Sequence, residues 1–284
     1  MRLISIVITM EEKTHKNSEV KITAEYINKL MDTATAKEAT DLKTKMGAAA
    51  MLFNLVSNKE AAVIMAYSDK ISEVISFDSN RSLSQLIFFS GNEEAIIELA
   101  RNHRALKSHV EKFNTLAGLM ARGAPDKAKI VLASQPKEIL MLPSLNLTPS
   151  SSKNFIVVET LVHYGSEKVH LAIAKNIEAL DIKVNDGYFT DVDEPVKQGT
   201  DDKPSSTPKA EHKPEPFHNY HVAHFLARMR HNSVLKELEK APENMQQLRT
   251  GDNKTLRELV AEMITRNLVG SSANILRNSS NILN

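Results

Sequence analysis

Four similar segments lie between Ala48 and Ile182, and they decide the fold: LFNLVSNKEAAVIMAYSDKI (52–71), LIFFSGNEEAIIELARNHRAL (86–106), LMARGAPDKAKIVLASQPKEI (119–139) and LVHYGSEKVHLAIAKNIEAL (161–180). Each segment begins with an apolar helix end, breaks at a short polar or glycine-containing turn, and resumes with an apolar stripe. Glycine can end the first helix, and Asn, Asp or Ser can accept amide hydrogens at the start of the second. The pattern therefore predicts two helices in each segment.

The second helices end alike, with alanine at the same place in each segment: Ala66, Ala100, Ala133 and Ala174. The intervals between them are 34, 33 and 41 residues, and the last is longer because 148–154 (TPSSSKN) has the composition of an inserted loop. Helix pairs repeated at this period, with a small side chain facing the neighbour, are typical of an α-solenoid. We expect a mainly α fold with about four helix pairs over 48–182; the alternative is a helical bundle without repeats.

The helix ending A-x-N/Q-x-x-x-I/L occurs in 133–139 (ASQPKEI) and 174–180 (AKNIEAL). In these residues the chain resembles the leucine-rich-repeat-variant and HEAT-like class of helical repeats. The resemblance covers roughly half of the chain. It implies a curved helical scaffold that binds other macromolecules, in a class that has occasional nucleic-acid-binding or enzymatic members.

The N-terminal part, 1–47, is predicted to hold a short strand and capping helices. Its apolar run, 3–8, resembles a signal peptide but is only six residues long, and Glu11, Glu12 and Lys13 follow without a small-residue cleavage site. The β-branched residues in this run favour a strand.

The part that follows the repeats is predicted from composition and turn signals. An Asp-Gly pair between short alternating segments indicates a hairpin or loop over 183–194. Five of the ten prolines fall in 195–216, which we expect to be a disordered, Pro-rich linker. Apolar residues at three- and four-residue spacings predict a helical module over 217–269, and 270–284 is expected to be a flexible tail.

Composition excludes several classes of protein. The chain has 36 Lys and Arg against 35 Asp and Glu, a net charge of +1, so no overall charge indicates a polyanionic partner. Cysteine is absent, which rules out disulfides, thiolate catalysis and cysteine-based metal sites. No apolar stretch approaches the roughly 18 residues that a bilayer span requires. We expect a cytoplasmic protein without membrane insertion.

A basic run follows the second segment, with Arg101, Arg104 and Lys107 as its predicted partner-binding residues. Such a run can contact phosphates or an acidic protein surface. The near-neutral total charge and the lack of interleaved aromatic residues weigh against a dedicated nucleic-acid-binding protein. We therefore expect one or more protein partners.

The C-terminal tail carries a second candidate contact. Asn-Ile-Leu recurs after seven residues, which gives the pairs Ile275/Leu276 and Ile282/Leu283. This spacing places both apolar pairs on one face if the tail becomes helical. We expect these four residues to bind a partner, and the alternative is a plain disordered terminus.

The third candidate feature is a cluster of three histidines, His218, His221 and His224. Their spacing places neighbouring imidazoles near one helix face, where zinc or nickel could use two of them. A closed site needs further ligands, and no carboxylate lies at a matching spacing. We predict a pH-sensitive helix start, with no metal and no cofactor.

No catalytic constellation is apparent in the sequence. The 118–123 stretch has the glycine spacing of a phosphate loop, but Ala-Pro follows in place of Lys-Ser. We expect a non-enzymatic scaffold or adaptor that works by protein–protein contact, as an accessory subunit of a bacterial secretion or coupling complex. The alternatives are a translocated bacterial effector and a helical-repeat protein that binds nucleic acid through the basic run.

Overall fold

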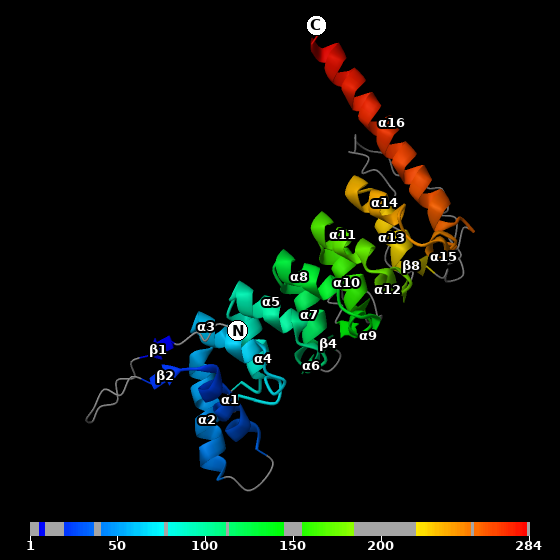
Figure 1. Ribbon diagram of the computed structural model, residues 1–284. Coiled ribbons are helices and arrows are strands. Elements are labelled where there is room, and N and C mark those ends of the chain that lie inside the picture. The colour runs from blue at the N-terminus through cyan, green and yellow to red at the C-terminus, as the bar shows by residue number, and fades with distance from the viewer. Residues whose placement is uncertain are drawn as a thin grey trace, which may run out of the picture. The chain divides into compact units, whose positions relative to one another are not determined.

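The computed structural model describes residues 6–8, 20–36, 41–76, 79–111, 114–144, 155–184, 220–250 and 253–282, with side chains described between Ile22 and Val269. The fold is mainly α, with short antiparallel strand pairs (Figure 1). The chain divides into two compact units, 1–176 and 177–284, and each is described by itself.

Unit 1 begins with a strand pair and two helices. Strand β1 (Ile6–Ile8) pairs antiparallel with β2 (Val20–Ile22), in agreement with the predicted N-terminal strand. Helix α1 (Ala24–Thr35) follows, with the Thr23 side chain accepting from the Tyr26 amide as its N-cap, and it packs on α2 (Leu42–Leu55). Helix α2 starts within the predicted N-terminal part, 1–47, and ends within the predicted repeats, where it serves as the first of the first helices.

The rest of unit 1 repeats one order of elements: a first helix, a second helix, a short third helix and a strand that pairs with the strand opening the next repeat. The first helices are α4 (Leu83–Phe89), α7 (Leu116–Gly123) and α10 (Val157–Tyr164). The second helices are α3 (Lys59–Ala66), α5 (Glu93–Arg101), α8 (Asp126–Ala133) and α11 (Glu167–Lys175). The short helices are α6 (His103–Leu106) and α9 (Lys137–Leu140). The strand pairs are β3 (His109–Glu111) with β4 (Asn114–Thr115), and β5 (Pro143–Ser144) with β6 (Phe155–Ile156).

Equivalent helices stack in chain order. The second helices pack as α3 on α5, α5 on α8 and α8 on α11, while the first helices pack as α2 on α4, α4 on α7 and α7 on α10 (Figure 1). Ala66, Ala100 and Ala133 have no exposed surface and Ala174 is 5% exposed, which confirms the predicted alanine positions. A small side chain at these sites lets neighbouring second helices approach closely.

Unit 2 continues the same order of elements. It holds α12 (Ile177–Leu180), β7 (Lys183–Val184), β8 (Tyr220–His221), α13 (Val222–Arg228), α14 (Asn232–Leu238), α15 (Glu243–Gln246) and α16 (Leu256–Ile282). Helices α13, α14 and α15 all pack on α16. The predicted C-terminal helical module is thus a further helix pair with its own short third helix.

Of the hairpin or loop expected over 183–194, the structure describes only Lys183 and Val184, which form strand β7. Strand β7 pairs with β8, Lys183 opposite His221 and Val184 opposite Tyr220, and the Val222 amide donates to the Ile182 carbonyl at 2.9 Å. Residues 185–194 and the predicted linker 195–216 lie outside the described residues. Strands β7 and β8, which lie before and after these residues in the sequence, belong to the same unit. The boundary between the two units falls earlier in the sequence, after Asn176.

Helix α16 extends into the stretch expected to be a flexible tail, because its backbone is helical as far as Ile282. Leu259, Val260 and Met263 bury their side chains, whereas Leu268 and Val269 are each 65% exposed. The side chains of Ile275, Leu276 and Ile282, and the whole of Leu283, lie outside the described residues.

Candidate functional site

A side-chain amide from the next repeat holds the end of three second helices, α3, α5 and α8. Asn102, which follows α5, donates from Nδ2 to the carbonyls of Ala66 at 2.9 Å and Ser68 at 3.0 Å. Its Oδ1 accepts from the Ala105 amide at 3.0 Å and so caps α6. Because the last carbonyls of a helix have no partner within the helix, Asn102 satisfies two acceptors of the preceding repeat and one donor of its own.

The same contact recurs in the two following repeats. Gln135 donates from Nε2 to the Ala100 carbonyl at 2.9 Å, and Asn176 donates from Nδ2 to the carbonyls of Ala133 at 3.0 Å and Gln135 at 2.9 Å. These amides occupy the N/Q position of the A-x-N/Q motif. The hydrogen bonds of these amides were not predicted from the sequence, although the recurring Asn or Gln was a usable signal.

A surface hollow of about 360 Å³ opens beside Asn102, and we call it the Tyr67 hollow. It is lined by Tyr67, Asp69, Glu98, Arg101, Asn102, His103 and Arg104. These residues come from the end of α3, the last turns of α5 and the start of α6. Since the amide of Asn102 ties these ends together, the hollow has a fixed frame.

Tyr67 is the aromatic residue of this hollow, and it is 65% exposed. Desolvation, followed by the hydrogen bond and charge of the Glu98 carboxylate, raises the pKa of its phenol, while Arg101 acts in the opposite direction. The hydroxyl therefore stays protonated at neutral pH. It offers both an apolar ring and a polar tip to an incoming group.

The three predicted basic residues all form ion pairs. Arg101 pairs with Glu98 on its own helix, and Arg104 pairs with Glu73 of the preceding repeat. Lys107 lies 3.6 Å from Glu138 of the following repeat, as measured between Nζ and Oε1. The structure brings Arg101 and Arg104 together in the Tyr67 hollow and leaves Lys107 outside its lining.

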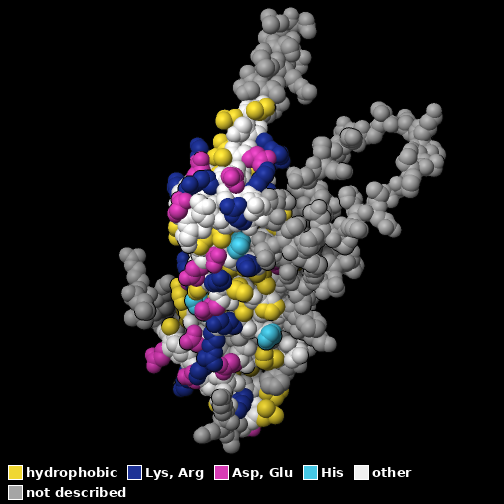
Figure 2. All heavy atoms as spheres, turned by 90° about the vertical axis from the view of Figure 1, so that its right-hand side faces the viewer, with side chains coloured by type: hydrophobic (Ala, Val, Ile, Leu, Met, Phe, Trp, Pro, Cys, Tyr) yellow, Lys and Arg dark blue, Asp and Glu magenta, His cyan; other side chains and the backbone are white. Residues whose placement is uncertain are grey.

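These acids alter the electrostatic character of the predicted run. Glu73 and Glu138 belong to the neighbouring repeats, so the sequence of the run does not reveal them. In Figure 2, Lys and Arg side chains are interspersed with Asp and Glu over the described part of the visible face. Because each of its three cations pairs with an acid, the run itself has mixed charge.

The histidine cluster is built differently from a metal site. His224 is fully buried; its Nδ1 accepts from the His221 amide at 3.1 Å, and its Nε2 lies 3.2 Å from the Leu248 carbonyl. Both ring nitrogens therefore face backbone groups. Within the described residues, no three His, Asp or Glu side chains gather closely enough to hold a metal ion, and His218 lies outside those residues.

Burial lowers the pKa of His224 from 6.5 to about 4, with smaller lowering contributions from His221 and Arg228 and an opposing contribution from the Leu248 carbonyl. A neutral imidazole that accepts at Nδ1 must carry its hydrogen on Nε2. His224 therefore donates to Leu248 and is a neutral core residue at pH 7.

Comparison with family models, curated proteins and solved structures finds no match to this chain. Over the ranges that the structure describes, no helix combines the length and apolar character needed to cross a membrane.

Proposed function

We propose that the chain is a non-enzymatic scaffold that binds a protein partner through the Tyr67 hollow. The observation that carries this proposal is an exposed tyrosine, flanked by Arg101 and Arg104, on a frame of stacked helices. Tyrosine and arginine are enriched among the residues that dominate binding energy at protein interfaces. A rigid frame reduces the entropy lost on binding.

The charges of the hollow favour a protein over a nucleic acid as the partner. Its lining holds two arginines and two acids, Asp69 and Glu98, so the formal charges balance when its histidine is neutral. Nucleic-acid affinity depends on phosphate contacts by an excess of cations. A balanced, partly aromatic hollow matches the mixed chemistry of a protein surface.

The lining also favours recognition over catalysis. His103 contributes the imidazole of the lining, and its Nε2 lies 2.6 Å from Gln135 Oε1 of the next repeat. That hydrogen bond gives the ring a structural role between repeats. The remaining groups can orient a bound side chain by hydrogen bonds and charge.

Finer parts of the proposal come from the sequence. We place the repeats in the leucine-rich-repeat-variant and HEAT-like class, the protein in the cytoplasm, and its partner in a bacterial secretion or coupling complex. The pairs Ile275/Leu276 and Ile282/Leu283 are proposed as a second contact. A translocated effector remains the alternative setting for the same binding surface.

The test compares partner capture by the full chain and by two variants, Tyr67→Ala and Arg104→Glu. Lysate of the native cell is treated with nuclease, and captured proteins are quantified by mass spectrometry. Phe89→Ala is the matched control, because Phe89 is another exposed aromatic, 53% exposed, outside the hollow. We expect both hollow variants to lose a protein that the wild type and the control retain. Capture that depends on nucleic acid, or equal capture by all four proteins, would refute the proposal.

A further inference from the structure

Helix α16 takes the place of a first helix in the order of the repeats. The Thr255 amide, just before α16, donates to the Glu258 carboxylate at 2.7 Å, as the Ser82 amide before α4 donates to the Gln85 side chain at 2.6 Å. The first helices α4, α7, α10 and α13 have seven or eight residues. Helix α16 has 27 and continues past α14 as one unbroken helix (Figure 1). The chain therefore runs straight on where the repeat order calls for a turn and a second helix.

The place of that second helix is an open hollow of unit 2. Each second helix packs on its own first helix and on the preceding second helix, as α5 does on α4 and α3, and α8 on α7 and α5. In the last repeat these two supports are α16 and α14. A hollow of about 300 Å³ lies between them, and we call it the terminal groove. Its described lining is Asn232, Lys236 and Glu239 on the α14 side and Ile264, Asn267 and Leu268 on the α16 side.

The α16 side of the terminal groove carries an apolar stripe that continues along the helix. Leu268 is 65% exposed, and Ile264, one turn earlier, is half-buried. Ile275 and Ile282 follow Leu268 at intervals of seven residues. Two helical turns take about seven residues, and the backbone is helical as far as Ile282, so these four positions share one face of α16.

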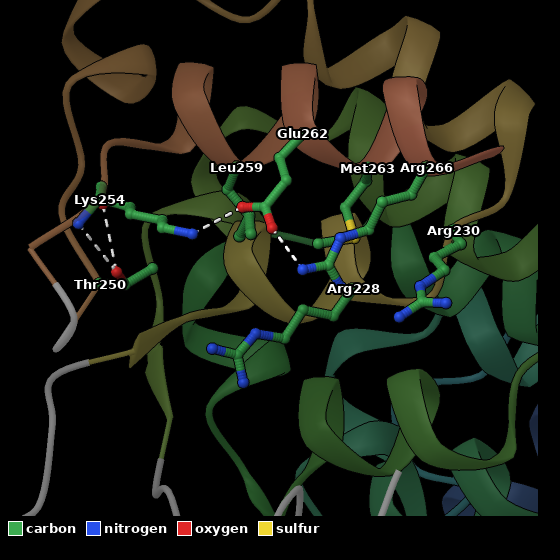
Figure 3. A pocket seen from close by; sticks show the side chains of 8 residues that line it. All are labelled: Arg228, Arg230, Thr250, Lys254, Leu259, Glu262, Met263 and Arg266. Atoms are coloured by element: carbon green, nitrogen blue, oxygen red, sulfur yellow. Dashed lines mark hydrogen bonds and ion pairs between the residues drawn. The ribbon is translucent and has the colours of Figure 1, made fainter. Parts of the chain in front are cut away.

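The ion pairs at the start of α16 lie on a different face of the helix. The Glu262 carboxylate lies 2.7 Å from Lys254 Nζ and 2.6 Å from Arg266 Nη2, and both contacts are dashed in Figure 3. Successive helical residues are about 100° apart, which places Ile264 nearly opposite both Glu262 and Arg266. These ion pairs hold α16 on its repeat and leave the apolar stripe uncovered.

The α14 side of the terminal groove is polar. The eighth residue after the N-cap is a buried alanine in α3, α5, α8 and α11, whereas in α14 it is the exposed Glu239. Lys236 adds a second exposed charge to this side. A terminal repeat with a polar outer face stays soluble without a neighbour. The groove is thus suited to a helix that binds reversibly and has polar as well as apolar side chains.

We propose that two copies of the chain form a dimer in which residues 270–282 of each copy, the α16 extension, lie in the terminal groove of the other. A continuous helix cannot place its later turns beside its own earlier turns, so the extension does not fill the groove of its own chain. An antiparallel pair of α16 helices fills both grooves at once, with the two-fold symmetry that is commonest among oligomers. This contact is independent of the Tyr67 hollow.

The composition of the extension matches both sides of the groove. Ile275, Leu276 and Ile282 provide apolar side chains for the stripe of the partner copy, and four serines and three asparagines provide hydrogen-bonding groups for the polar α14 side. Arg277 is the one charged residue of the extension, which limits the cost of removing it from water. The second contact proposed from the sequence is thereby assigned to another copy of the same chain.

Analytical ultracentrifugation of the full chain at a series of concentrations is the first test. We expect a monomer–dimer equilibrium. Leu268→Asp should raise the dissociation constant of the dimer by at least about tenfold, because the dimer buries this leucine twice. Val269→Asp is the matched control, since Val269 is on the same helix and equally exposed at 65% but does not line the groove. A chain that stays monomeric at sub-millimolar concentration, or a dimer that both variants weaken equally, would overturn the proposal.

Cross-linking is the second test, and the absence of cysteine from the chain makes each introduced thiol unique. Lys236→Cys places a thiol on the α14 side of the groove, and Ser279→Cys places one in the extension. Mixed and treated with a short bis-maleimide, these two proteins should give a covalent pair containing one of each. Lys127→Cys, on an exposed side chain of α8, replaces Lys236→Cys in the control and should give far less product. Equal yields, or a link within one monomer of the double variant Lys236→Cys/Ser279→Cys, would contradict exchange between copies.

Discussion

Gln85 and His224 make equivalent contacts in two different repeats: each side chain joins the backbone amide just before a first helix to a backbone carbonyl near the end of the same repeat. Gln85 is the third residue of α4; its Oε1 accepts from the Ser82 amide at 2.6 Å, and its Nε2 donates to the Val110 carbonyl at 3.4 Å. His224 is the third residue of α13 and connects the start of that helix to Leu248 in the same way. In each repeat, one side chain ties the beginning of the first helix to the backbone near the end of the repeat, in strand β3 for Val110 and just before the isolated bridge of Arg249 with Thr255 for Leu248.

Because His224 is a titratable side chain buried at this position, it is a source of pH-dependent stability. The pKa of His224 is about 4 in the folded chain against an ordinary 6.5. Between pH 6.5 and 4, the ring is therefore protonated in the unfolded chain and neutral in the folded chain. The stability conferred by the neutral ring is complete above pH 6.5 and is lost as pH falls towards 4. We expect a loss of about 3 kcal/mol over this window, from denaturant unfolding at a series of pH values.

His224→Gln is the corresponding variant, because glutamine can accept and donate at both contacts as Gln85 does. Between pH 6.5 and 4, its free energy of unfolding should fall less steeply than that of the wild type by the contribution of this one residue. Identical slopes for the two proteins would show that His224 does not titrate as described.

Asn102→Ala should destabilise unit 1. The change leaves the buried Ala66 carbonyl and the Ser68 carbonyl without their donor, at a cost of about 2–3 kcal/mol in the free energy of unfolding. Asn54→Ala, an exposed site on α2, is the control and should stay within about 0.5 kcal/mol of the wild type. Urea unfolding followed by circular dichroism measures both; a mild effect at Asn102 would mean that water replaces the amide.

Gly118→Ala should be costly in a helix where alanine is normally favourable. A Cβ at Gly118 would clash with Asn114 Oδ1 and lie 2.8 Å from both the Pro143 carbonyl oxygen and the Ser144 Cα. We expect a loss of about 1–3 kcal/mol from overpacking, measured by thermal unfolding. Gly47→Ala is the opposite case within α2, where a Cβ meets nothing within 4 Å, and it should gain about 0.5–1 kcal/mol. Equal effects at the two sites would contradict this assignment.

Arg104→Ala should separate binding from folding. Its ion pair with Glu73 is exposed, 61% and 38% for the two side chains, and such pairs contribute under about 1 kcal/mol to stability. The melting temperature should therefore barely change while partner capture weakens. Lys127→Ala breaks an equally exposed pair with Glu93 and should affect neither. A large drop in melting temperature for Arg104→Ala alone would assign this residue to the fold instead.

The helix pairs could be predicted because their signals are local. Capping residues, turn glycines and the buried alanines recur at a fixed period, and the predicted Ala133 contact is present. The strand pairs could not be predicted, since each strand has only two or three residues and its partner is set by the helices on either side. The pairing of Val184 with Tyr220 shows this most clearly.

The candidate site was predictable only in part for a related reason. Arg101 and Arg104 were visible as a basic run, but Glu73 reaches Arg104 from another repeat, and sequence distance conceals that contact. The bridging residues were also concealed, because Gln85 and His224 perform one role with different chemistry. Equivalence of position becomes visible only when the hydrogen bonds are known.

The pairing of β7 with β8 makes this chain a candidate for a split protein. Strand β8 and helix α13 follow the interval between Val184 and Tyr220, while β7 and α12 precede it, and all four belong to unit 2. If the chain is divided between Val184 and Tyr220, one polypeptide carries β7 and the other carries β8, so each strand finds its partner only on the other polypeptide. Expressed separately, they should reassemble into one particle, which makes the interval a place to install a reporter or a cleavable switch without disturbing the helices.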